Sequence, residues 1–217
     1  MIELRRDIEA AAIGNPVAVT GTSGVGGQMR GLYGFIATTN DFGAGGVAPN
    51  PVTNTAPTLG TLRPLVEASL KAVILGAFTN GGDSAVLLVS PSHKTKVSSF
   101  TANVQRTNEV AMQPGVSKSK ASNDVILQTS FTFYGHDYGV TKVVPDRVMT
   151  GAGAGLINTD YLVDYDKLAL GQLRPFEKEQ LATVGDAKQW QIRTEVTLVV
   201  RDEKPLAAIR DLTATGN

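Results

Sequence analysis

Two glycine-rich stretches are the first candidates for ligand chemistry. Residues 21–28, Gly-Thr-Ser-Gly-Val-Gly-Gly-Gln, contain two glycines five positions apart, as in a phosphate-binding loop. That loop needs a lysine and a hydroxyl residue directly after its second glycine, but Gly27 and Gln28 stand there. Residues 151–155, Gly-Ala-Gly-Ala-Gly, miss the dinucleotide fingerprint because the third glycine comes one residue too soon. Both stretches are therefore predicted to be loops rather than nucleotide sites.

Acidic side chains offer two further possibilities. His136 and Asp137 could act as a base and its orienting partner, but neighbours in a strand or turn usually point apart. No serine stands in a nucleophile-elbow context either. Asp160, Asp164 and Asp166 could gather a divalent cation, although they lack the glycine and terminal glutamate of an EF-hand loop. A solvated loop is the favoured interpretation, and a stabilising ion is the alternative.

The residue inventory narrows the chemistry further. The chain has no cysteine and two histidines, His93 and His136, which excludes disulfides, thiolate metal sites and a cysteine nucleophile. We therefore expect no catalytic residues, no cofactor and no metal. An unrelated enzyme with a hidden carboxylate site remains a distant alternative. It would require a deep pocket lined by Asp146, Asp164 or Glu195 with perturbed ionisation.

Length and charge bound the class of protein. The 217 residues, 42% of them hydrophobic, suffice for one large domain or two small ones with a sizeable core. Twenty basic and 20 acidic residues balance to zero, so the total charge gives no support for a protein that grips nucleic acid through phosphates. No run of about 18 apolar residues and no signal-peptide pattern is present. These features predict a soluble protein outside the membrane.

Hydrophobic periodicity predicts the elements that would position these residues. Helical spacing favours helices over residues 3–13, about 62–74 and 94–100, with one or two helical turns over 177–183. Residues 17–60 are predicted to be a long loop region. Alternating or continuous apolar runs predict strands over 85–89, 125–134, 139–145, 161–164 and 191–201, and residues 205–212 return beside the last of them. The resulting fold class is α+β, with helices early and strands late.

Three blocks of residues, in order and at their spacing, carry a resemblance to a known family. The first block comprises Glu3–Glu9 and Arg30–Ile36, and the second comprises Val86–Pro91, Lys94 and Val97–Phe100. The third comprises Tyr138–Val140, Val143–Arg147, Leu173–Pro175, Leu181–Asp186, Glu195–Leu198 and Glu203–Lys204. From about residue 3 to 212, the chain resembles the major capsid proteins of tailed bacteriophages with the Hong Kong 97-type fold.

The resemblance implies a division of the chain. Residues 1–60 would hold the end of the spine helix and loops of the peripheral domain. Residues 61–173 would form the axial domain, and residues 174–217 would return to the peripheral sheet. Such proteins carry an N-terminal arm and an extended loop before the spine helix. Only two residues precede Glu3, so the chain is expected to lack both.

The resemblance also implies a function. The chain would be a structural subunit of the virion that assembles with copies of itself into pentamers and hexamers in the host cytoplasm and encloses the phage genome. Scaffold, portal and decoration proteins would be further partners, DNA contact would be weak and non-specific, and no membrane would be involved. A capsid-like bacterial compartment is the alternative. The candidate inter-subunit contacts are Arg5, Arg6, Asp7, Glu9, Arg147, Arg174 and Trp190.

Overall fold

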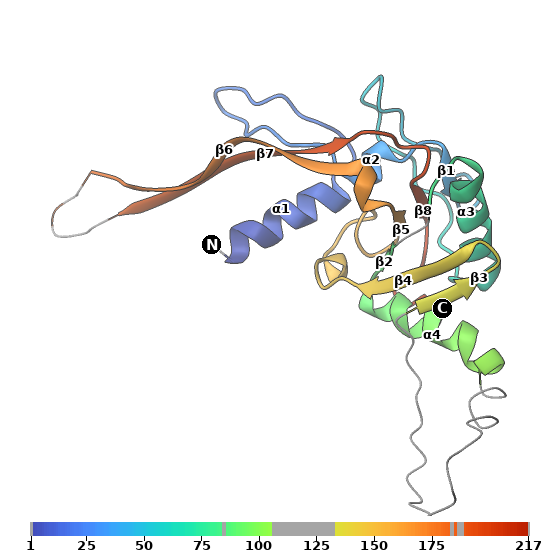
Figure 1. The fold of residues 1–217 in the computed structure, drawn as a ribbon. Coiled ribbons are helices and arrows are strands. Elements are labelled where there is room, and N and C mark those ends of the chain that lie inside the picture. Colours follow the sequence, from blue (N-terminus) through green and yellow to red (C-terminus); the bar gives the residue numbers. More distant parts are fainter. Residues whose placement is uncertain (1, 84–85, 106–132, 183–184, 186–188, 217) are drawn as a thin grey trace, which may run out of the picture.

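The protein consists of a body and a long two-stranded arm. A computed structural model describes residues 2–83, 86–105, 133–182, 185 and 189–216. The arm is formed by β6 (Leu168–Gln180) and β7 (Trp190–Val200), and helix α1 (Ile2–Gly14) lies beside it (Figure 1). This combination of a mixed sheet with few helices confirms the predicted α+β class.

A six-stranded mixed sheet organises the body. Its order is β1-β8-β5-β2-β4-β3, in which β1 and β8, and also β2 and β4, run parallel, while the other neighbours run antiparallel. The strands are β1 (Thr39–Asp41), β2 (Val86–Val89), β3 (Phe133–His136), β4 (Gly139–Pro145), β5 (Asp160–Val163) and β8 (Ala207–Ile209). The central strands β2 and β5 are short apolar runs because both of their faces are covered.

Successive residues of the central strands point into two different cores. Leu87 and Val89 pack with helix α3 (Glu67–Thr79) and with Val97 of α4 (Pro91–Gln105). Val86 packs on the opposite face with the end of α1, the short helix α2 (Leu32–Phe35) and the 3-10 turn η1 (Val148–Thr150). The two-residue period of a strand thus places the sheet between two helical layers.

Prolines fix where two helices begin. Helix α3 begins at Glu67, later than the predicted start near residue 62. Pro64 disfavours helical backbone at the residue before it, and the Leu65 N–H donates to the Gly216 carbonyl (3.0 Å). Helix α4 begins with Pro91 at its first position, before the predicted helix over 94–100, since the missing N–H there has no helical partner to lose. No helix in the described parts of the chain is long and apolar enough to cross a membrane.

Pairing partners correct two other predictions. Residues 177–180 are not helical but continue β6, where Glu177 pairs with Arg193 across the arm. Residues 207–209 do not pair with β7, because β8 inserts between β1 and β5. Most of the strand predicted over 125–134 lies outside the described residues, and only its last two residues are seen, at the start of β3.

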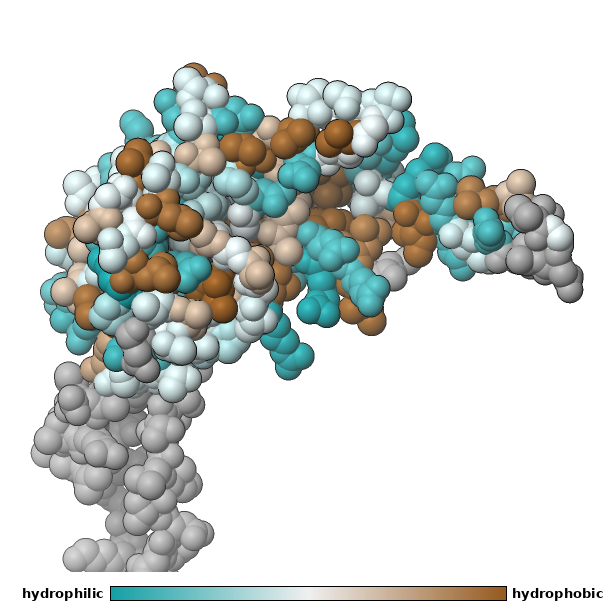
Figure 2. Space-filling view, turned by 180° about the vertical axis from the view of Figure 1, so that it is seen from behind, coloured by the Kyte–Doolittle hydropathy of each residue, from teal (hydrophilic) through white to brown (hydrophobic). Residues whose placement is uncertain are grey.

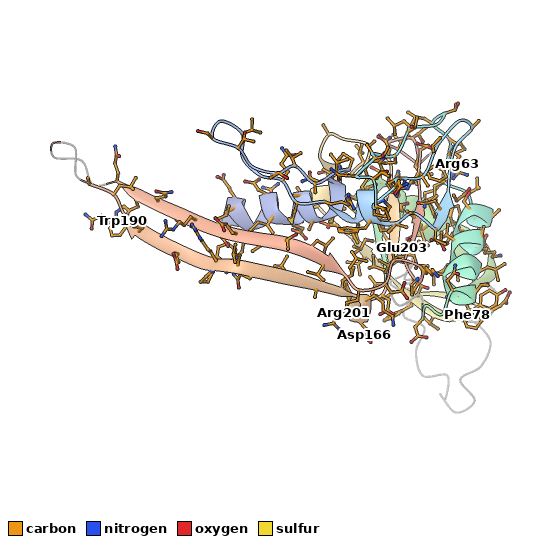
Figure 3. All side chains as sticks on the ribbon, turned by 90° about the horizontal axis from the view of Figure 1, so that it is seen from above. Arg63, Phe78, Asp166, Trp190, Arg201 and Glu203 are labelled. Atoms are coloured by element: carbon orange, nitrogen blue, oxygen red, sulfur yellow. The ribbon has the colours of Figure 1, made fainter. Side chains whose placement is uncertain are left out.

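Glu203 ties the chain between the arm and β8 to the loop after α2. Its carboxylate accepts hydrogen bonds from the backbone N–H groups of Ala37 (3.0 Å) and Thr38 (3.1 Å) and from the Thr38 hydroxyl (Figure 3). Hydrogen bonds to a charged acceptor contribute about 1.5–3 kcal/mol when buried, and this site is half-buried. The carboxylate therefore fixes the base of the arm to the body.

Replacing Glu203 with alanine is expected to lower the free energy of unfolding by about 1–2 kcal/mol, because two backbone donors lose their acceptor. Glu203→Gln keeps an acceptor oxygen and is expected to cost less than half as much. Urea denaturation followed by circular dichroism measures both changes. Equal losses for the two variants would show that charge, rather than the acceptor geometry, is what matters at this position.

Candidate assembly surfaces

The arm exposes large apolar side chains to solvent. Leu173 is 81% exposed and Trp190 is 53% exposed, values far from those of core residues. The exposed apolar residues of the arm strands are Leu170, Leu173, Phe176, Trp190, Ile192 and Val199. Figure 2 shows the arm leaving the body, with hydrophobic residues reaching its surface among hydrophilic ones. Exposed apolar side chains that gather on one extended element favour an interaction surface.

Helix α1 covers only part of the apolar stripe on the arm. Alternate residues of β7 from Trp190 to Val200 share one face of the arm. Leu4 and Ile8 of α1 meet Thr194–Thr197 in a groove of about 570 Å³, and Val196 and the residues after it on this face are half-buried. Trp190 and Ile192 continue the same stripe, but both are exposed. The arm extends past the start of α1 (Figures 1 and 3), so the distal stripe is uncovered.

The opposite face of β7 carries charge. Arg193 approaches Glu177 at 3.4 Å and Glu179 at 3.5 Å, and Arg174 approaches Glu195 at 3.5 Å. Exposed pairs of this kind contribute at most about 1 kcal/mol each, so they add little to the stability of the arm. They line one face of the arm with charge, whereas the other face of β7 carries the apolar stripe. A two-stranded hairpin is marginal in water by itself, and its edges invite pairing. The arm is therefore suited to a partner.

Two of the predicted contact residues lie where α1 meets the arm. Arg5 stacks its guanidinium over the Phe176 ring at 5.9 Å, and Asp7 lines the groove between α1 and β7. Trp190 stands near the far end of the arm, where the Lys178 ammonium lies 4.2 Å from the centre of its ring. Sequence reasoning missed Phe176, because residues around it were not recognised as a strand.

The remaining predicted residues lie on the exposed surface of α1 and at the turn before η1. Arg6 and Glu9 are largely exposed. The part of the Glu9 carboxyl that is shielded from solvent, together with the nearby Asp146 charge, raises its pKa against the lowering effect of Arg6. Arg147 is exposed next to Asp146, whose carboxylate accepts a 2.8 Å hydrogen bond from the Val148 N–H at the start of η1. Glu9 of α1 therefore lies close enough to Asp146, before η1, for the two charges to interact.

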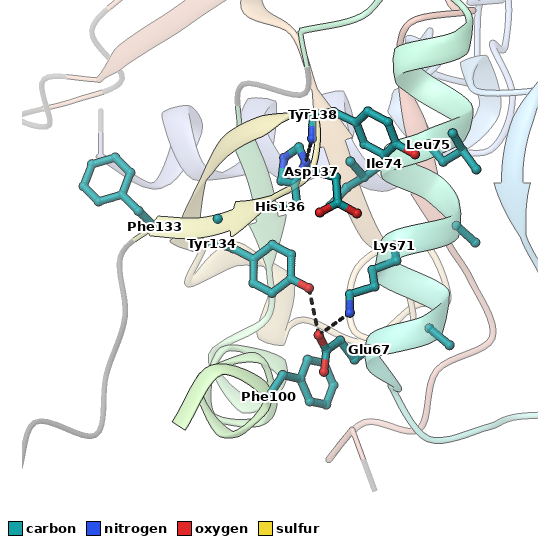
Figure 4. Close-up of a pocket in the computed structure, with 13 residues that line it drawn as sticks. Glu67, Lys71, Ile74, Leu75, Phe100, Phe133, Tyr134, His136, Asp137 and Tyr138 are labelled. Carbon is teal, nitrogen blue, oxygen red and sulfur yellow. Dashed lines mark hydrogen bonds and ion pairs between the residues drawn. The ribbon is translucent and has the colours of Figure 1, made fainter. Parts of the chain in front are cut away.

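A separate cavity of about 670 Å³ lies between α3 and the β3–β4 hairpin (Figure 4). Glu67 accepts hydrogen bonds from Lys71 (2.9 Å) and from the Tyr134 hydroxyl (3.1 Å). The Lys71 contact, aided by Tyr134, lowers the pKa of Glu67, and burial together with Glu67 raises that of Tyr134 to about 12. The carboxylate is therefore ionised and the phenol protonated at neutral pH, so neither is poised to exchange a proton in catalysis.

The carboxylates that an enzyme would need do not converge. Asp146 and Asp164 each accept from a backbone N–H two residues ahead, in separate turns, while Glu195 pairs with Arg174 on the arm. Asp160 is buried against His93, away from solvent. No group of three or more potential metal-binding side chains occurs among the residues that the structure describes.

An arm that leaves the distal end of its apolar stripe exposed is typical of a subunit that associates with other chains. Comparison with known protein families agrees with this class. Residues 1–213 match the family described as SU10 major capsid protein, and the chain belongs to this family. It is thus a structural subunit of a phage capsid and a component of the virion, and the family points to a non-enzymatic role. No curated protein matches the chain.

Proposed function

We propose that the chain has the Hong Kong 97-type capsid fold, with α1 as the end of the spine helix. The observation that supports this most is the lengthwise packing of α1 against β7, beside a compact sheet-centred body. In this proposal residues 1–60 and 174–217 contribute the peripheral domain, and residues 61–173 contribute the axial domain. Strands β1 and β8 bring the first and last segments to one edge of the body sheet.

The proposed assembly surface combines α1 and the arm. The apolar stripe that ends in Ile192 and Trp190 would be buried against a second copy, and the charged residues of α1 would set its orientation. The proposed contacts are Arg5, Arg6, Asp7, Glu9, Arg147, Arg174 and Trp190. Each contact is weak by itself. The same contacts recur in every pentamer and hexamer, so their effects add up when the shell closes.

Further partners follow from this role. Scaffold, portal and decoration proteins would bind the assembled shell, and assembly would take place in the host cytoplasm. The formal net charge of zero supports contact with the packaged DNA that is weak and not sequence-specific.

Charge reversal of Arg6 tests the role of α1. Arg6→Glu is expected to reduce the assembled fraction at least tenfold, because the exposed guanidinium would become a repulsive carboxylate in every repeated contact. The subunit should unfold at an unchanged temperature, since Arg6 is exposed and stands outside the core. Sedimentation velocity measures assembly, and Lys142→Glu on exposed β4 is the matched control. If the Arg6 variant assembled normally, α1 would not be part of the assembly surface.

A further inference from the structure

The last described residues of the chain are held between two parts of the body. The backbone N–H of Thr213 donates to the Arg63 carbonyl at 3.0 Å, and the N–H of Leu65 donates to the Gly216 carbonyl at 3.0 Å. On the other side, a Cβ at Gly216 would lie 3.2 Å from the His93 ring of α4. Residues 212–216, here called the C-terminal segment, therefore fill the space between residues 63–65 and α4.

His93 connects this segment to the sheet. Its side chain has no exposed surface, and its two ring nitrogens have different partners. Nδ1 lies 2.8 Å from the Asp160 carboxyl oxygen Oδ1 at the start of β5, and Nε2 lies 2.9 Å from the Thr213 carbonyl oxygen. Both partners are buried or half-buried, so water cannot easily replace either contact.

The geometry fixes the number of protons. A carbonyl oxygen accepts hydrogen bonds only, so Nε2 must carry a proton to bond to Thr213. The contact between Nδ1 and Asp160 then needs one more proton, bound to the imidazole or to the carboxyl group. We propose that His93 and Asp160 share this additional proton, and that its loss releases the C-terminal segment from α4.

Loss of one proton affects the Thr213 side. After one proton has been lost to solvent, the neutral ring keeps its remaining N–H on Nδ1. The hydrogen bond from Nδ1 to the Asp160 carboxylate is charge-assisted and therefore stronger than the one from Nε2 to the Thr213 carbonyl. Nε2 then presents a lone pair to the Thr213 carbonyl oxygen, and the 2.9 Å contact becomes repulsive. The contact between His93 and Asp160 therefore stays intact, while the contact between His93 and Thr213 breaks.

Among the residues that the structure describes, few other charged groups stand near His93 and Asp160. Lys94 and Lys96 stand on α4 itself, and Arg63, which ion-pairs with Asp41 at 2.9 Å, stands on the segment opposite. The C-terminal segment, Leu-Thr-Ala-Thr-Gly, has no ionisable side chain. Asp160 is therefore the group that sets the charge state of His93.

The pKa directions agree with a retained proton. Burial by itself would lower the pKa of His93, but the hydrogen bond and charge of Asp160, with the Thr213 carbonyl, raise it above its ordinary value. Burial raises the pKa of Asp160. Because the closed state binds the proton more tightly, its stability is complete below about pH 6.5 and falls as pH rises through the raised pKa. Opening should increase by up to about tenfold per pH unit there.

Selective ¹⁵N labelling of histidine tests the proposal directly, because the chain has only two histidines. His136→Gln assigns the two imidazole signals, and His136, whose pKa burial lowers, is the internal control. His93 is expected to carry protons on both nitrogens at pH 6 and to titrate above its ordinary range to the Nδ1–H tautomer. The proposal would be overturned if His93 titrated at or below its ordinary range, or if its neutral ring at high pH carried the proton on Nε2. This test leaves His93 itself unsubstituted.

Amide hydrogen exchange provides the structural readout. The Leu65 amide, which donates to Gly216, is expected to lose protection above the His93 pKa after correction for intrinsic exchange. Asp160→Asn should abolish this pH dependence, and His93→Gln should replace it with pH-independent protection, since a neutral amide can donate to Thr213 at any pH. If either variant folded and kept the wild-type pH dependence, a proton shared by His93 and Asp160 could not be what holds the C-terminal segment.

Discussion

Arg210→Ala is expected to lower the free energy of unfolding by about 3–5 kcal/mol, the largest effect of any single substitution proposed for this chain. Arg210 is 1% exposed, and its NH2 group donates to the carbonyls of Tyr33 (3.0 Å) and Ile36 (2.9 Å). Its Nε donates to Asn40 at 2.6 Å. Alanine would leave these three acceptors without their donors and open a cavity beside β8.

Aromatic rings on both sides add to the effect. The guanidinium lies 4.6 Å from the ring centre of Tyr33 and 5.6 Å from that of Phe42, and buried cation–π contacts contribute about 2 kcal/mol or more. Arg210 therefore joins α2 and the loop around β1 to β8, which are far apart in sequence.

Urea denaturation followed by circular dichroism measures the loss, because the single tryptophan lies on the arm and reports poorly on the body. Arg210→Lys keeps the charge but cannot reproduce the planar fork, so an intermediate loss is expected. Arg201→Ala, an exposed arginine close by in sequence, is the matched control and should change stability by less than about 0.5 kcal/mol. If Arg210→Ala lowered the free energy of unfolding by less than 1 kcal/mol, the contacts of Arg210 would not stabilise the fold as argued.

The double variant Trp190→Ser/Ile192→Ser is expected to abolish assembly while leaving the subunit folded. Both residues are exposed in the subunit, so their loss removes little from the core. In an interface, a buried tryptophan commonly contributes 2 kcal/mol or more, which corresponds to a loss of about 30-fold or more in affinity for each contact. Repetition of that loss around a closed shell should leave no assembled particles at subunit concentrations that suffice for the wild type.

Val52→Ser is the control for surface hydrophobicity. Val52 is 93% exposed at the tip of a loop outside the arm, and its replacement removes apolar surface without touching the stripe. Electron microscopy and sedimentation of the three proteins measure the difference. If the arm variant forms particles as readily as the Val52 variant, the distal stripe does not hold subunits together.

Local patterns predicted the elements whose identity depends on their own residues. Residues 3–13 have helical spacing and a firm stop at Gly14-Asn15-Pro16, and they form α1. The predicted strands over 139–145 and 191–201 match β4 and β7 closely. In each case hydrophobic periodicity and turn residues favour the same secondary structure as the tertiary packing. The local sequence was therefore sufficient to predict it.

Other elements depend on partners that a single sequence does not reveal. Residues 177–180, Glu-Lys-Glu-Gln, favour a helix by intrinsic propensity, but pairing with β7 holds them in β6. Two irregularities in pairing, around Arg174 and between it and Glu177, also break the alternation that would have revealed the strand. Local propensity therefore failed where cross-strand contacts dominate.

The candidate surface was predicted only in part. The charged residues of α1 and Trp190 followed from the resemblance, but the apolar residues Leu173 and Phe176 did not. The pairing of His93 with Asp160 joins residues 67 positions apart, and Arg210 contacts residues about 170 positions away. Contacts of this range arise from the topology of the sheet, so the sequence shows the residues but not their partners.

The emission of Trp190 during assembly tests the central claim most directly. Because it is the only tryptophan and is 53% exposed in the subunit, its fluorescence reports on the arm alone. As sedimentation shows particles forming, we expect a blue-shifted emission and at least a threefold loss of quenching by acrylamide. Assembled particles whose Trp190 remains as red-shifted and as easily quenched as in the free subunit would contradict burial of the arm between subunits.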